Sequence, residues 1–343
     1  EVSENLKRIG GLELPELKPI LPVENPYWYR NKMEFSFSNQ RWLTKEEVDS
    51  GVEFNRNALG FHKPGMWDKI VDVSTCHLQA DPSNAIRNFV RVYAHENSIS
   101  FFDPKNKAGF LRSLMIRTTS TEEVMIVLQV FHKEDTILFP LLDALAQEFP
   151  DITSLQYVIN GKANDTLYDQ EIVCYKGQDY ITEVMEALQF RITAKSFYQT
   201  NSLQAFELYK VVRELADLQG DELVYDLYTG TGTIAQFVAQ KAQKVVGVDV
   251  VPDSINAAKS NAVHNKIDNV FFETGDMKAI FTEEFIDRHG KASVVITDPP
   301  RDGMHKDVVQ QLLDLSPDRI VYVSCNSATQ ARDLSLMKEQ YRL

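Results

Sequence analysis

The stretch LVYDLYTGTGT at residues 223–233 decides the fold. A short apolar run ends at Asp226 and Leu227, a loop with Gly230 and Gly232 follows, and TIAQFVAQKA then has a helical pattern. Glycine lets a backbone turn tightly and approach a ligand closely. This order of strand, glycine loop and helix predicts one unit of a parallel α/β sheet with a ligand above the loop.

The same alternation continues downstream of this stretch. Three further apolar runs each precede a helical pattern: KVVGVDV before SINAAKSNAVHN, SVVITDP before KDVVQQLLDL, and RIVYVSC before ATQARDLSLMKEQ. Apolar strands that alternate with helices predict a parallel sheet covered on both faces, which binds ligands beyond the carboxyl ends of its strands. We therefore expect a Rossmann-like domain over residues 195–343, with its C-terminal part incomplete because YRL at 341–343 resembles the start of a strand.

The upstream part of the chain has a different pattern. Residues 1–24 hold two proline-flanked segments and are expected to be a helix end followed by irregular chain. Residues 25–194 predict an α+β domain with an antiparallel sheet. Its expected strands are YRNKMEFSFSN, SLMIRTT, EEVMIVLQVF, SLQYVIN and QFRITA, and its expected helices are PSNAIRNFVRVYAHEN and TILFPLLDALAQEFP.

Composition narrows the class of protein. The chain has 343 residues, of which 43% are hydrophobic and 25% charged, and three widely spaced cysteines that provide no disulfide framework. No apolar run approaches the ~20 residues that span a bilayer. We expect a monomeric cytoplasmic protein without a membrane partner. The formal net charge of −13 argues against nucleic-acid binding over the whole surface, but a local basic groove remains compatible with it.

The cofactor is predicted from the residues around the glycine loop. Asp249 ends the next strand, where a carboxylate can accept hydrogen bonds from both ribose hydroxyls of a nucleotide-like cofactor. The third glycine of a dinucleotide motif is replaced by Ala235, and Asp226 is more typical of S-adenosyl-L-methionine binding. We expect this cofactor, with a nicotinamide nucleotide or a plain turn as alternatives. Asp276 either reaches the adenine edge or caps a helix.

The two remaining strand ends carry candidate chemistry. Asp298 ends VVITDPPRDG, and Arg301 stands where adenine-N6 methyltransferases place an aromatic residue after the prolines, so it is expected to hold an oxygen or a phosphate. Cys325 ends RIVYVSC before a helix whose N-terminus favours a thiolate, although a small core residue is the alternative. Together they suit methylation of carbon 5 of a uracil, in which a thiolate first adds to carbon 6.

At this point the motifs resemble the RNA uracil-C5 methyltransferase family, which modifies transfer RNA and large-subunit ribosomal RNA. The resemblance covers most of the chain and includes YRNKMEFSF, KSFYQTNS, DLYTGTGT, DPPRDG and VYVSCNSATQARDL. It implies a covalent nucleophile, an RNA partner with ribosomal RNA ahead of transfer RNA, and cofactor or base contacts from further residues. The nucleophile it implies is Cys325, and the contacts it implies are Gln199, Tyr228, Asp249 and Asp298.

Three departures from the family pattern bear on these expectations. The sequence contains no N-terminal basic β-barrel module, and Cys76 matches one ligand of a 4Fe-4S cluster without the family's other three cysteines. The family's general base follows the ARDL helix, so we expect it beyond Leu343 and expect this chain not to turn over. Asp333 and Glu339 are interpreted as solvated residues. The alternatives are a methyltransferase acting on another nucleobase and an inactive RNA-binding factor.

Overall fold

Five parallel strands form the sheet of the C-terminal part, in the order β12-β11-β10-β13-β14. The computed structural model describes residues 1–343. The strands are β10 (Leu223–Leu227), β11 (Lys244–Asp249), β12 (Val270–Thr274), β13 (Val294–Thr297) and β14 (Arg319–Tyr322). The order reverses between β10 and β13, which is where ligands bind in such sheets. The predicted parallel sheet is confirmed.

Helices cover both faces of this sheet because its apolar side chains alternate. Val224 and Val245 pack with one group of helices, whereas Tyr225 and Val246 pack with the other. The first group is α5 (Ser202–Ala216), α6 (Thr233–Ala239) and α7 (Pro252–His264), and the second is α8 (Glu283–His289), α9 (Lys306–Leu315) and α10 (Ser327–Met337).

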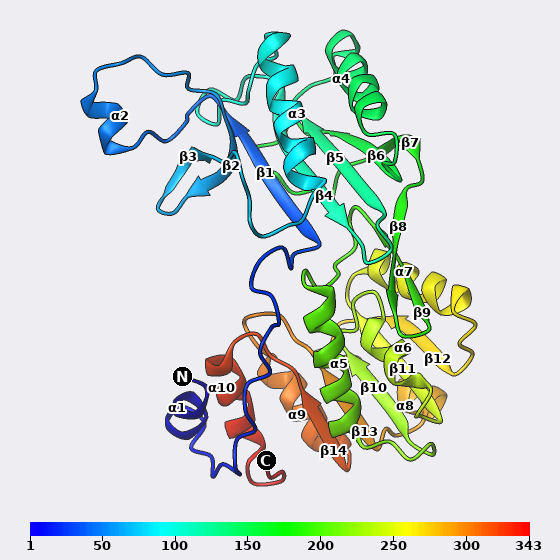
Figure 1. Cartoon of the computed structure of the whole chain (residues 1–343). Coiled ribbons are helices and arrows are strands. Elements are labelled where there is room, and N and C mark those ends of the chain that lie inside the picture. The colour runs from blue at the N-terminus through cyan, green and yellow to red at the C-terminus, as the bar shows by residue number, and fades with distance from the viewer.

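The central part is built on a seven-stranded sheet in the order β3-β2-β1-β4-β5-β6-β7, above the parallel sheet in Figure 1. Its strands are β1 (Lys32–Ser38), β2 (Ala58–Lys63), β3 (Met66–Asp72), β4 (Leu111–Thr118), β5 (Val124–Val130), β6 (Ser154–Ile159) and β7 (Ile172–Gly177). One face is apolar and packs against α3 (Ser83–Glu96) and α4 (Asp135–Glu148). One pair departs from the antiparallel expectation: β5 and β6 are parallel, because α4 connects them as a crossover.

A separate hairpin of β8 (Tyr180–Met185) and β9 (Leu188–Thr193) follows the seven-stranded sheet and precedes the parallel sheet in the chain. Ile181 and Phe190 belong to the same apolar cluster as the helices of the parallel sheet, and Asn261 of α7 accepts a hydrogen bond from the Arg191 amide at 2.9 Å. We propose that the C-terminal domain begins with this hairpin, near residue 179, rather than at the expected residue 195.

Both ends of the chain lie in the lower part of the molecule in Figure 1, where the N-terminal helix is next to α10. Helix α1 (Val2–Arg8) packs against α10, and Asn5 Nδ2 donates to Ser327 Oγ at 2.8 Å. Residues 341–343 form no strand; the Tyr341 side chain packs on the core and donates to the Pro317 carbonyl at 2.8 Å.

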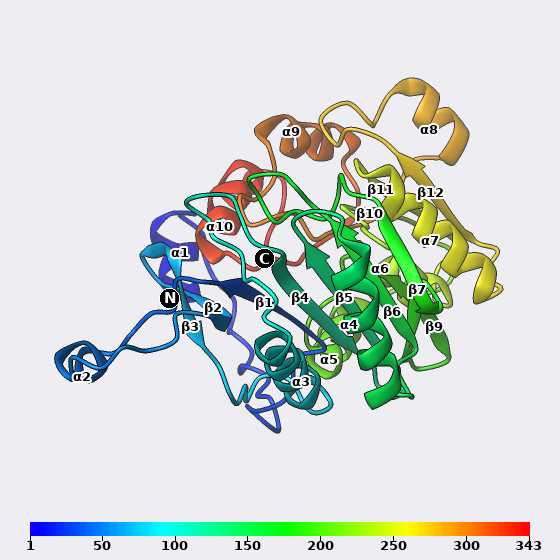
Figure 2. The ribbon, with the colours of Figure 1, turned by 90° about the horizontal axis from the view of Figure 1, so that it is seen from above.

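A loop carrying α2 (Lys45–Asp49) projects away from the upper body in Figure 2. None of the helices combines the length and the apolar character that a membrane span requires.

Candidate active site

The predicted site residues follow directly on neighbouring strands of the parallel sheet. Parallel neighbours end at one edge, so the loops after β10, β11, β13 and β14 meet there. Backbone hydrogen bonds connect these loops in turn: Thr229 N to Val248 O at 3.0 Å, Asp298 N to Leu227 O at 3.3 Å, and Val323 N to Thr297 O at 2.9 Å. The structure therefore brings Gly230, Asp249, Asp298 and Cys325 to a common edge.

Asp249 holds the glycine loop in place. Its Oδ2 accepts from the Gly230 amide at 2.9 Å, and its Oδ1 accepts from the Val251 amide at 2.9 Å. A carboxylate oxygen has a second lone pair, so each oxygen retains the capacity to accept a hydroxyl. Asp249 therefore combines support of the loop with the chemistry needed to bind a ribose.

Asp226 lies beneath the loop and is only 1% exposed. Its Oδ2 accepts from Thr229 Oγ1 at 2.5 Å and from the Ala235 amide at 3.1 Å, whereas its Oδ1 has no partner. Burial raises the pKa of Asp226 to about 7, and the nearby Asp298 carboxylate adds to this effect. The loop therefore rests on a buried carboxyl group with one acceptor free.

The two glycines of the loop serve different needs. Gly230 has φ +55° and open space where a Cβ would stand, which leaves its ligand side free. Gly232 has φ +75°, and a Cβ there would lie 2.5 Å from Phe272 Cζ, so packing already requires glycine at this position. Tyr228 also has a positive φ, of 60°, and burial raises its pKa to about 12. Gly230 is thus the better candidate for a cofactor contact.

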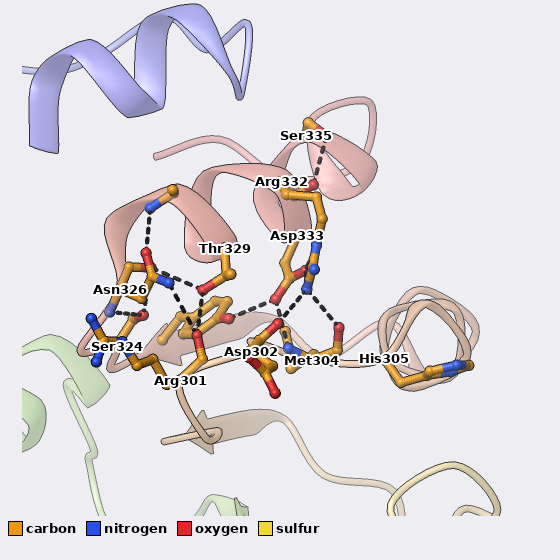
Figure 3. Close-up of polar contacts among 12 residues, drawn as sticks. Arg301, Asp302, Met304, His305, Ser324, Asn326, Thr329, Arg332, Asp333 and Ser335 are labelled. Atoms are coloured by element: carbon orange, nitrogen blue, oxygen red, sulfur yellow. Dashed lines mark hydrogen bonds and ion pairs between the residues drawn. The ribbon is translucent and has the colours of Figure 1, made fainter. Parts of the chain in front are cut away.

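Asp298 and Arg301 begin the loop that faces the Cys325 loop. Burial raises the pKa of Asp298 to about 6. The Arg301 carbonyl accepts from Asn326 Nδ2 and from Thr329 Oγ1, both at 3.2 Å, which ties the two loops together (Figure 3). The Arg301 side chain is exposed and makes no ion pair within the chain, so it is available to an anionic or carbonyl oxygen.

Cys325 is exposed and directly precedes α10. Asn326 caps this helix, since its side chain accepts from the Ala328 amide at 3.1 Å. The alternative that Cys325 is a small core residue is therefore wrong. The thiol lies exposed directly before the N-terminus of α10.

The interpretation of Asp333 as a solvated residue is also wrong. Asp333 is 1% exposed, and its carboxylate accepts from the Met304 amide and from Tyr322 Oη, both at 2.7 Å (Figure 3). Arg332 pairs with it at 2.7 Å and also donates to the Asp302 carbonyl at 2.9 Å. This cluster anchors the loop after Asp298 to α10.

Gln199 lies on the segment before α5, and this segment contacts the glycine loop. The Phe197 carbonyl accepts from Thr231 Oγ1 of the glycine loop at 3.4 Å. Asn31, just before β1, donates from its side chain to the Gln199 carbonyl and from its backbone to the Thr200 carbonyl, both at 2.8 Å. Sequence reasoning missed Asn31, and the only available signal was its place in YRNKMEF.

Comparison with known proteins identifies the family to which this chain belongs. A profile of the tRNA (uracil-5-)-methyltransferase family matches residues 115–343. An uncharacterized RNA methyltransferase of Bacteroides thetaiotaomicron is 52% identical and aligns with 100% of this chain and 76% of its own length. Another, from Porphyromonas gingivalis, is 54% identical over 98% of this chain and 74% of its own length. The chain belongs to the tRNA (uracil-5-)-methyltransferase family.

A solved structure of this family has the same architecture. Pyrococcus abyssi tRNA (uracil-54, C5)-methyltransferase in complex with S-adenosyl-L-homocysteine matches with a TM-score of 0.75 and 28% identity, over 98% of this chain and 75% of that one. The chain is thus an S-adenosylmethionine-dependent RNA methyltransferase of the tRNA (uracil-5-)-methyltransferase family. Its own residues fit that cofactor, since Asp226 has a free acceptor, Asp249 has spare lone pairs and Gly230 faces open space.

Asp276 follows β12 at the same sheet edge, where the Gly275 amide donates to the Asp249 carbonyl at 3.0 Å, whereas Cys76 lies in the central domain. Asp276 is exposed, and its Oδ1 accepts from the Lys278 amide at 3.0 Å; Thr282, not Asp276, caps α8. Cys76 is buried in the core of the central domain, 4% exposed, and no group of three metal-ligating side chains occurs in residues 1–343. One thiolate does not hold a 4Fe-4S cluster, so Cys76 by itself does not fit one.

Proposed function

We propose that this chain methylates carbon 5 of a uridine in RNA through a covalent bond to Cys325. The observation that carries the proposal is the exposed thiol at the N-terminus of α10, on the sheet edge that also holds the glycine loop. Ribosomal RNA is the first substrate to test. Transfer RNA, the substrate named for the Pyrococcus abyssi enzyme, is the second.

The residues divide the reaction between them. S-adenosyl-L-methionine supplies the methyl group as a sulfonium. The Cys325 thiolate adds to carbon 6 of the uracil, which makes carbon 5 nucleophilic, and the free Arg301 guanidinium is suited to stabilise the charge that develops on a carbonyl oxygen. After carbon 5 has taken the methyl group, a base removes its proton and the bond between carbon 6 and sulfur breaks. The uracil must be single-stranded or flipped out for this approach.

For proton removal from carbon 5, the C-terminal carboxylates provide no suitable general base. Asp333 is buried and already accepts from an amide, a phenol and a guanidinium, and Glu339 is exposed beyond the end of α10. Neither suits a base placed against carbon 5. We therefore expect this chain to form the adduct faster than it releases product.

The test of the proposal is an adduct with RNA that carries 5-fluorouridine. Fluorine at carbon 5 cannot leave as a proton does, so a stable adduct is expected with S-adenosyl-L-methionine present, visible by denaturing gel electrophoresis. Cys325→Ser should abolish the adduct and retain S-adenosyl-L-homocysteine binding. Cys174→Ser, which alters the other exposed thiol, is the matched control and should retain both. An adduct that persists in Cys325→Ser would contradict the assignment.

Two further measurements test the alternatives, which are a methyltransferase acting on another nucleobase and an inactive RNA-binding factor. Nucleoside analysis of the methylated RNA identifies the modified base. Single-turnover methyl transfer separates an enzyme from a factor that only binds RNA. Multiple-turnover rates, compared with the adduct rate, test the slow release.

A further inference from the structure

The face of the seven-stranded sheet that turns away from α3 and α4 carries a cavity of about 270 Å³. Its polar wall comes from four adjacent strands, β2, β1, β4 and β5, and from the loop between β6 and β7. The polar side chains are Glu34, Ser36, His62, Ser113, Gln129 and Asp165. This cavity is separate from the loops at the edge of the parallel sheet.

Strand register connects the cavity to the candidate active site. Lys32 pairs with Arg117, Glu34 with Met115, and Ser36 with Ser113, so successive rows on this face lead from Arg117 into the cavity. At the lower end of the rows, Arg117 donates to the Ser196 carbonyl at 2.6 Å, three positions before Gln199. A strand rises about 3.4 Å per residue, so a few nucleotides of single-stranded RNA suffice to span these rows.

The lining selects the kind of group that fits. No lysine or arginine lines the cavity itself, and the two cations that contact its wall, Lys32 and Arg112, are paired with Glu34 and Asp165, which argues against a phosphate. Gln129 is 1% exposed; its Nε2 donates to the Asp165 carbonyl at 3.2 Å, but its Oε1 has no partner. A buried acceptor without a donor is costly, and a ligand N–H group would satisfy it. The carboxylates of Glu34 and Asp165 also line the cavity. Glu34 pairs with Lys32 and Asp165 pairs with Arg112, and each carboxylate keeps further lone pairs that can accept a hydrogen bond.

The remaining wall is apolar and suits the face of a ring. Met115, Val127 and Leu167 complete the lining. Acceptors beside an apolar wall match a nucleobase that presents amino and imino N–H groups, and guanine has two adjacent donors of this kind for one carboxylate. A uracil, which offers a single N–H between two carbonyls, matches less well.

We propose that this cavity binds an unpaired guanine base of the RNA, a few nucleotides from the methylated uridine, with Glu34 as the main acceptor. The inference rests on the proposed function, because it assumes that the substrate is RNA bound with its target base near Gln199. The central domain would then recognise the RNA sequence, and the candidate active site would methylate the uridine.

The experiment measures binding of short single-stranded RNAs to the whole chain with S-adenosyl-L-homocysteine present. Each RNA is a uridine heptamer or the same heptamer with one guanosine at successive positions, and affinity is read from fluorescence anisotropy. A guanosine at one or two positions should tighten binding about ten-fold, as expected for one charge-assisted hydrogen bond pair. Glu34→Gln should remove this preference and leave uridine heptamer binding no weaker.

Glu96→Gln, an exposed carboxylate on α3 at the opposite face of the sheet, is the matched control and should keep the preference. Equal affinities for all heptamers in the unaltered chain, or a preference that survives in Glu34→Gln, would overturn the proposal. A preference for adenosine or cytidine instead would overturn the choice of guanine. The 5-fluorouridine adduct, measured on the same variants, reports separately on the proposed function.

Discussion

Asp226 supports the glycine loop with one carboxylate oxygen while its other oxygen has no partner. An aspartate with an ordinary pKa near 3.8 loses its proton early in the unfolded chain, whereas the folded chain keeps this proton up to about pH 7. Between pH 4 and pH 7 the folded state therefore binds more protons than the unfolded state. The stability that protonated Asp226 contributes is complete below about pH 4 and is lost as the pH rises to about 7.

Asp226→Asn should therefore change the pH dependence of unfolding. The asparagine amide does not titrate in this pH range, and its NH₂ group takes the place of the unpaired oxygen. The unfolding temperature of the variant, relative to the unaltered chain, should be higher at pH 8 than at pH 5. Asp221→Asn, an exposed neighbour, should shift neither value. An unfolding difference that is the same at both pH values would show that Asp226 titrates normally.

Asp249→Ala should weaken S-adenosyl-L-homocysteine binding about ten-fold or more, measured by titration calorimetry. The loss follows from removing at least one charge-assisted hydrogen bond to the ribose and from releasing the Gly230 amide. Asp253→Asn, an exposed carboxylate in the first turn of α7, should bind as the unaltered chain does. Unchanged affinity in Asp249→Ala would rule out the ribose contact.

Helix α10 holds the loop after Asp298 in place through two of its polar residues. Thr329 binds the Arg301 carbonyl, and Asp333 binds the Met304 amide, so one helix fixes both ends of a short loop. Gly303 lies between them, where a Cβ would come within 2.6 Å of Asp333 Oδ2. The loop and the helix are therefore fitted to each other.

Asp333→Ala should lower the free energy of unfolding by roughly 1–3 kcal/mol for each buried donor left without a partner. Tyr322 and Met304 are the donors at risk. Chemical denaturation followed by circular dichroism measures the change, and Asp287→Ala on the exposed side of α8 should leave stability within about 0.5 kcal/mol. If both variants unfold alike, Asp333 does not anchor the loop.

Helices and strands are predictable from the sequence where the residues that determine them are close together in the chain. The strands before Asp249, Asp298 and Cys325 were predictable, because apolar runs and the helices after them repeat. β2 and β3 were missed although Pro64 and Gly65 mark the turn between them. The contacts of Asn31 were not predictable from its place in YRNKMEF, since its partners lie 168 and 171 positions away. Asp333 was misjudged because a polar residue on a helix face indicates solvent unless a buried partner faces it.

For the whole molecule, we propose a division at the hairpin of β8 and β9 rather than at the change of sequence pattern near residue 195. Ile181, Met185, Phe190 and Ile192 are at most 4% exposed and lie in the cluster shared with α5, α6 and α7. A fragment of residues 179–343 should therefore unfold at a higher temperature than a fragment of residues 195–343. Burying these side chains is worth roughly 1.5–3 kcal/mol each.

Light scattering and calorimetry on the two fragments provide the measurement. The shorter fragment should also aggregate more, because it exposes the surface that the hairpin covers. Equal unfolding temperatures and equal solubility would place the boundary near residue 195 after all.

The contact between α1 and α10 has a consequence for biosynthesis. Asn5 and Ser327 are 322 positions apart in the chain. At a translation rate of about 5–20 residues per second, α1 leaves the ribosome roughly 16–65 seconds before the helix on which it packs. Until then Leu6 has no surface to cover it, so a nascent chain arrested before α10 should leave this first helix open to a protease or a chaperone. Protection of α1 from cleavage would then mark the moment at which the methyltransferase domain closes.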